Sequence, residues 1–233
     1  MRRYRSLVLL LAPALLLAPP ATVGAQTIPS PYDFIDTDWD AGFYVAQVSE
    51  ERGEAGFGPG GGLMFGLRGG VHLSGPFGME ANAFLLPTDR DIYRPVPELG
   101  QVERLGTANT LVGGLDARVR FTLTGTRTWR DLAPYVSAGG GIIGEMRPRN
   151  DIEDENTLPQ DSRFRMGPSF LGVLGAGTRW FPTEQISIHL ETSAHFWKLG
   201  TPRNFQQLGT SAGIPDQEWP AIAVLLIGGS YRF

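Results

Sequence analysis

Five residues in the last quarter of the chain have the types that nucleophilic catalysis requires. Serine, histidine and a carboxylate form hydrolase sites in which the histidine accepts the proton of the serine hydroxyl. Here such residues recur at every second position: Ser187, His189, Glu191, Ser193 and His195. On an extended strand this spacing puts all of them on one face, about 6.6 Å apart at successive positions. We therefore expect neighbours in this series to need further groups in order to hydrogen-bond.

The stretch that carries these residues is one of several in which apolar and polar side chains alternate. A period of two is typical of strands that have one apolar face. The pattern predicts eight strands, near residues 40–49, 63–73, 77–85, 111–124, 132–146, 166–181, 185–198 and 219–233. The connections alternate in length, with short turns at 74–76, 125–131 and 182–184 and longer loops at 50–59, 87–108, 147–163 and 199–218. The facing of the first strand is not defined by its sequence.

The final strand, Trp219 to Phe233, has one apolar face with aromatic residues at both ends and no charge. Such a face suits a strand exposed to lipid, with its rings at the two headgroup levels. A soluble barrel of the lipocalin type is the rival fold, and it would have its apolar side chains inside.

The beginning of the chain has the pattern of an export signal. Residues 1–25 contain Arg2, Arg3 and Arg5, a short apolar core and small residues before a cleavage point. The apolar core is shorter than the roughly 20 residues that span a bilayer. Residues 26–38 are predicted to be a periplasmic lead-in, and residues 39–233 the β-domain. The chain has no cysteine, and its net charge of −4 argues against nucleic acid as a partner.

The export signal, the eight amphipathic strands and the ending Tyr231-Arg232-Phe233 together resemble the small outer-membrane β-barrel family of bacteria, of the OmpA-barrel and OmpX kind. The resemblance implies an all-β, eight-stranded, antiparallel, up-and-down transmembrane barrel in the outer membrane. It further implies that Tyr231 and Phe233 are an assembly signal for the barrel assembly machinery. Outer-membrane lipids and lipopolysaccharide are the expected partners. The resemblance identifies a fold rather than an activity.

The face opposite the apolar one carries almost all of the charged residues within the strands. An eight-stranded barrel has just enough interior for side chains to fill it. Charges buried there must be paired and hydrogen-bonded. We therefore predict a network that plugs the lumen and is structural in role: Arg68, Glu80, Asp116, Arg118, Arg120, Arg179, His189, Glu191 and Arg232.

Three functions follow from this pattern. The leading one is a non-enzymatic structural or surface-interaction role, with an external ligand reached through the long loops. The alternative is a narrow channel or transporter for small hydrophobic or lipid-like solutes. It would use inward apolar residues, namely Met64, Phe84, Val112, Ile143, Leu171, Val173, Ile222, Val224 and Leu226. A lipid A hydrolase is less favoured, because the serines and histidines of residues 187–195 face inward and the His-x-Ser order of the deacylases does not occur among them.

Metal and cofactor sites are not predicted. The acidic run at residues 151–155 lacks the spacing of a calcium loop and is interpreted as a solvated loop. The sequence contains no phosphate-binding loop and no cofactor motif.

Overall fold

The computed structural model describes residues 30–33, 35, 39–54, 56–147, 150–208 and 214–233. The predicted export signal, 1–25, and most of the predicted lead-in lie outside these residues. Residues 1–30 and 31–233 form separate units, and all of the described strands belong to the second. Within the part of the chain that is described, no helix is long and apolar enough to cross a membrane.

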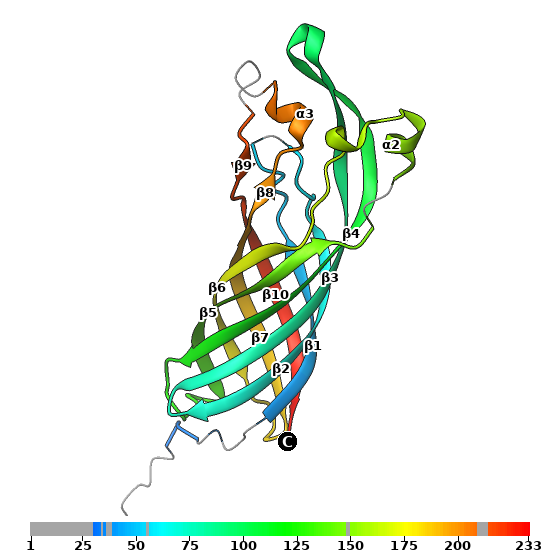
Figure 1. Cartoon of the computed structure of the whole chain (residues 1–233). Coiled ribbons are helices and arrows are strands. Elements are labelled where there is room, and N and C mark those ends of the chain that lie inside the picture. Colours follow the sequence, from blue (N-terminus) through cyan, green and yellow to red (C-terminus); the bar gives the residue numbers. More distant parts are fainter. Residues whose placement is uncertain (1–29, 34, 36–38, 55, 148–149, 209–213) are drawn as a thin grey trace, which may run out of the picture. The chain divides into compact units, whose positions relative to one another are not determined.

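The second unit is a closed antiparallel barrel (Figure 1). Its eight strands are β1 (Trp39–Val48), β2 (Gly62–Ser74), β3 (Phe77–Val96), β4 (Gln101–Thr122), β5 (Leu132–Glu145), β6 (Ser169–Trp180), β7 (Ile186–Trp197) and β10 (Ala221–Arg232). Each strand pairs with its neighbour along the chain, and β1 closes the barrel against β10. The predicted fold is confirmed, including the weakly patterned first strand.

The alternation of side chains sorts each strand into an inner and an outer face. On β1, whose sequence left the facing open, Asp40 and Tyr44 are buried while Trp39 and Phe43 are exposed. Large apolar side chains cover the outside of the wall on every strand, and Leu225 on β10 is 58% exposed. A soluble protein rarely exposes so extensive an apolar surface. The outer wall therefore faces lipid, and the lipocalin alternative is wrong.

Short turns join the strands at one end of the barrel and longer connections join them at the other (Figure 1). In outer-membrane barrels the short turns are periplasmic and the long connections are external. We therefore call the long-connection end the external end.

The prediction of a polar loop at residues 87–108 is wrong, because this segment continues the barrel strands. β3 and β4 remain paired from Pro87↔Leu111 to Val96↔Gln101, where the short 3-10 helix η1 (Pro97–Leu99) joins them. The resulting hairpin projects beyond the barrel (Figure 1), and we call residues 87–111 the external arm. Apolar and polar residues do not alternate in this segment, because much of the arm meets water on both faces. A register shift between Ile92 and Tyr93 also interrupts the pairing of β3 with β4.

The other long connections contain short elements of their own. They are α2 (Asp151–Glu155), the 3-10 helix η2 (Gln160–Ser162), β8 (Leu199–Gly200), α3 (Arg203–Gln206) and β9 (Gln217–Glu218).

The acidic run at residues 151–155 is a helix rather than the solvated loop that was expected. The Asn150 side chain accepts a hydrogen bond from the Glu153 backbone and so caps the helix, and acidic residues fill its first turn. Glu153 itself is buried, because its carboxylate pairs with Arg90 of the external arm at 3.1 Å.

Candidate functional site in the barrel lumen

The inward side chains form two layers, and the ionic layer lies toward the short-turn end. All nine residues predicted for the lumen network are buried inside the barrel: Arg68, Glu80, Asp116, Arg118, Arg120, Arg179, His189, Glu191 and Arg232. Each of them lies at a buried position of its strand or strand end. Their mutual contacts show how the charges are balanced.

Glu191 on β7 is the centre of this layer. Its carboxylate accepts hydrogen bonds from Arg68 Nη2 at 3.1 Å and from Arg118 Nη1 at 2.7 Å. The Tyr135 hydroxyl donates a third at 2.7 Å. Glu191 thus joins β7 to β2, β4 and β5 through fully desolvated, charge-assisted hydrogen bonds, which are the stronger kind. Tyr135 was not predicted, although its inward position follows from the alternation of β5.

A second carboxylate, Asp116, is held by its own strand and by β3. Arg118 donates to both of its oxygens, at 2.6 and 3.1 Å, in the bidentate geometry that suits guanidinium and carboxylate. Asn82 bridges the two halves of the network: its amide nitrogen donates to Asp116 at 2.8 Å, and its amide oxygen accepts from Arg68 at 2.8 Å.

The remaining pairs lie closer to the short-turn end. Glu80 forms an ion pair with Arg120, and Arg179 donates to Asp40 at 2.9 Å. Asp40 was missed because the facing of β1 could not be deduced. The guanidinium of Arg232 lies over the Phe181 ring, 4.7 Å from its centroid.

The serine and histidine residues of β7 contact one another directly. His189 Nε2 lies 3.2 Å from Ser187 Oγ and 2.8 Å from Ser230 Oγ. His195 Nε2 lies 3.2 Å from Ser193 Oγ. The expectation that such neighbours need further groups was wrong, because side chains on a strand lean along its direction and shorten the gap.

Among the described residues, no carboxylate orients the second nitrogen of His189 in the manner of a catalytic triad. The partners of Glu191 are arginines and a tyrosine, and the Nδ1 atom of His189 has no hydrogen-bond partner. A catalytic histidine needs a group that orients its second nitrogen. Both histidines are also buried within the barrel, 1% and 2% exposed. The geometry therefore suits hydrogen-bonding that holds the lumen together.

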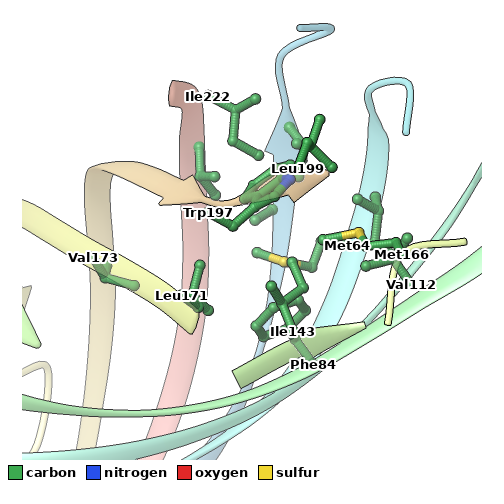
Figure 2. Close-up of a cluster of buried hydrophobic side chains, with 14 of the residues drawn as sticks. Met64, Phe84, Val112, Ile143, Met166, Leu171, Val173, Trp197, Leu199 and Ile222 are labelled. Atoms are coloured by element: carbon green, nitrogen blue, oxygen red, sulfur yellow. The ribbon is translucent and has the colours of Figure 1, made fainter. Parts of the chain in front are cut away.

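The apolar layer fills the external half of the lumen (Figure 2). All nine inward apolar residues proposed for a hydrophobic route are buried in one cluster: Met64, Phe84, Val112, Ile143, Leu171, Val173, Ile222, Val224 and Leu226. Trp197 at the end of β7, Leu199 of β8 and Met166 of the β5–β6 connection belong to the same cluster. These side chains pack against one another.

Aromatic residues from the external connections cover this layer. The Phe57 ring meets Phe205 edge-on at 4.8 Å and Tyr93 edge-on at 5.6 Å, and stacks with Phe164 at 5.9 Å. We call these four residues the aromatic cap. The cap was not predicted, and its only sequence signal is that large aromatic residues occur within otherwise polar connections.

The external arm is fixed to the rim of the barrel by Arg90. This buried guanidinium donates to Glu145 of β5 and to Glu153 of α2, both at 3.1 Å. Beside it, Ile92, Ala108 and Leu158 form a small apolar cluster. The described residues around Arg90 thus form a folded structure at the external end.

Asp91, further along the arm, accepts hydrogen bonds from two side chains. Arg104 donates to Asp91 at 2.7 Å and Thr107 donates to the same oxygen at 2.9 Å. The hydrogen bond from Arg104, assisted by Thr107, holds the pKa of the Asp91 carboxyl below its ordinary value of 3.8. The stabilisation is complete above pH 3.8 and is lost as the pH falls through the lowered pKa.

A ¹³C NMR titration of the Asp91 carboxyl should therefore have its midpoint below 3.8. Arg104→Gln removes the charged donor, so it should move the midpoint up toward that value. An unchanged midpoint in this variant would show that Arg104 does not set the titration.

Solved structures of outer-membrane proteins are similar to this chain. No protein-family model matches the chain, and no curated protein matches its sequence. The solved structure of OprG from Pseudomonas aeruginosa is similar, with 12% identity, a TM-score of 0.55, and 86% of this chain and 99% of that chain covered. OmpW from Escherichia coli has 15% identity and a TM-score of 0.47, over 84% of this chain and 98% of that one.

A third structure, Neisserial surface protein A, has 10% identity and a TM-score of 0.47, over 88% of this chain and 98% of that one. At 12% identity, the likeness to OprG shows the fold, which is that of a small outer-membrane barrel. This fold and the apolar outer wall together place the chain in a bacterial outer membrane.

Proposed function

We propose that this protein is a sealed, non-enzymatic outer-membrane barrel that presents a folded external surface. The observation that carries the proposal is the filling of its lumen at successive levels. The ionic layer around Glu191 is followed by the apolar layer and then by the aromatic cap over Phe57. A solute that crossed the barrel would have to displace all three.

The ionic layer opposes conduction for an energetic reason. Its charges are paired inside a barrel that has little spare interior, so water could enter only by breaking desolvated pairs such as Arg118–Glu191. The hydrogen bonds run across strands β2, β3, β4, β5 and β7, and opening one pair therefore disturbs the others.

The external arm supports the surface role. It is a paired hairpin tied to the rim by Arg90, and it carries exposed charges near its tip, including the Arg94–Glu103 pair. A rigid hairpin loses less conformational freedom on binding than a mobile loop does. We propose that an external ligand binds to this arm and its neighbouring connections.

At the other end, Tyr231 and Phe233 stack at 6.4 Å and are 53% and 69% exposed. Their exposure leaves them accessible to the barrel assembly machinery, and we propose that they are its recognition signal. Outer-membrane lipids and lipopolysaccharide are the proposed partners of the wall.

Conductance in planar bilayers tests the sealed lumen. We expect the refolded wild-type protein to give no current steps above those of a protein-free bilayer, while a porin in the same apparatus conducts. Uptake of a small apolar solute into vesicles should likewise be no faster than in protein-free vesicles. Current steps would contradict the ionic seal, and faster uptake would support the hydrophobic-transport alternative.

A further inference from the structure

A recess in the lipid-facing wall arises from small residues on three adjacent strands. Ala83 of β3, Gly113 of β4 and Gly144 of β5 all occupy outward positions in the alternation of their strands, although Met146 buries Gly113. Gly113 is paired directly with Gly144, and Ala83 lies diagonally across from Gly113, because Leu85, two residues after Ala83, is the residue paired with Gly113. The resulting recess has a volume of about 760 Å³. This lies within the range of about 300–1,000 Å³ that is typical of ligand sites.

Large apolar side chains form the sides of this recess, which we call the lower recess. Phe65, Leu115 and Ile142 are each at least 50% exposed, and Met146 lies across Gly113. The recess is open on the outer wall, whose neighbouring side chains are also apolar. Its surroundings match a hydrocarbon chain of the bilayer.

A second recess, of about 630 Å³, lies immediately toward the external end. The same strands line it: Pro87 lies two residues beyond Leu85 on β3, Leu111 lies two residues from Gly113 on β4, and Arg147 follows Met146. We call it the upper recess. Unlike the lower one, it has several polar side chains in its lining, namely Thr88, Asp89, Asn109 and Arg147.

The order of the two recesses corresponds to the order of groups in a membrane lipid. The lower recess suits an acyl chain. In the upper recess the Arg147 guanidinium suits a phosphate, because such a cation near a membrane surface attracts anionic headgroups. Asp89 and Asn109 suit hydroxyl groups, since a carboxylate only accepts hydrogen bonds and an amide both donates and accepts.

We propose that the two recesses together bind one molecule of a phosphorylated, acylated sugar lipid of the outer leaflet, with the chemistry of lipid A. Asp89, whose Oδ1 also accepts from Arg52 at 3.0 Å, favours a sugar lipid over a glycerophospholipid, since a sugar headgroup offers it more hydroxyl donors. The proposal rests on the outer-membrane placement given above. It adds a defined lipid site on the wall.

Native mass spectrometry of the full chain in detergent tests the site. The protein is incubated separately with lipid A, phosphatidylglycerol and phosphatidylethanolamine. We expect one lipid A molecule to be retained, and retained better than either phospholipid. Equal retention of phosphatidylglycerol would overturn the proposal in favour of a general preference for anionic lipids.

Two variants locate the site. In Gly144→Leu the new Cβ meets only ordinary contacts, the nearest being the Gly167 carbonyl oxygen at 3.5 Å, so the side chain fills the lower recess without strain at Cβ. We expect retention of lipid A to fall roughly tenfold, as for other pockets that lose space for a few methylenes. Arg147→Gln, in the upper recess, should reduce it roughly fivefold.

The matched control is Gly69→Leu. Gly69 also faces outward, on β2, and a Cβ there comes no closer than 4.0 Å to a neighbour, but it lines neither recess. Retention in this variant should equal that of the wild type. Retention unchanged in Gly144→Leu and Arg147→Gln would overturn the proposal.

Gel mobility with and without boiling separates failure of the site from failure of the fold. Every variant that is compared must show the heat-dependent shift of a closed membrane barrel. If the wild type lacks the shift, the outer-membrane placement itself fails. If Gly144→Leu alone lacks the shift, Arg147→Gln decides the proposal, because Arg147 follows the end of β5 and is exposed.

Discussion

Replacing Glu191 with glutamine should destabilise the folded barrel by about 3–5 kcal/mol, the usual cost of removing one partner from a buried ion pair. Arg68 and Arg118 both donate to this carboxylate, and the side chains of all three are at most 3% exposed. Glutamine keeps the shape of the side chain but leaves these guanidinium groups with one negative charge fewer. Urea unfolding of protein refolded in lipid vesicles measures the change.

The matched control for this prediction is Glu103→Gln on the external arm. Glu103 also pairs with an arginine, Arg94, at 2.6 Å, but the two side chains are 51% and 43% exposed. Exposed pairs contribute about 0–1 kcal/mol, so this substitution should change the free energy of unfolding little. If both substitutions had equally small effects, the lumen charges would be hydrated and the proposed seal would be wrong.

The second large effect is expected on the outer wall. Leu190 is midway along β7 and 51% exposed, between strands that are also apolar on this side. Leu190→Arg should reduce the free energy of unfolding in lipid vesicles by about 2–4 kcal/mol, because arginine at the midplane of the lipid face loses its hydration. The same urea titration measures it.

Leu99→Arg is the control for this substitution. Leu99, at the tip of the external arm, is 68% exposed. Both leucine side chains are therefore exposed on the surface of the protein. They differ in their surroundings, since Leu190 faces lipid and Leu99 faces water. A surface substitution in water changes stability by about 0.5 kcal/mol or less, so Leu99→Arg should have little effect. An equal effect of the two substitutions would mean that the apolar wall does not face lipid.

The sequence by itself determined the wall of the barrel. A period of two is a local property, since adjacent side chains on a strand point to opposite faces whatever the strand pairs with. This is why the inward positions of Arg118 and His189 and the outward position of Leu190 could all be predicted. The even number of strands and the alternating lengths of their connections then indicated closure, with β1 against β10.

The tertiary structure alone decided which charges meet. Glu191 is 123 residues from Arg68 and 73 from Arg118, and their contact depends on the stagger of strands around the barrel, which no local pattern encodes. The external arm and the aromatic cap also required the structure. The alternation of apolar and polar residues indicates a strand with one buried face, so a hairpin largely surrounded by water lacks that signal. The rings of Phe57 and Phe205 are far apart in the sequence and contact each other only because the barrel closes.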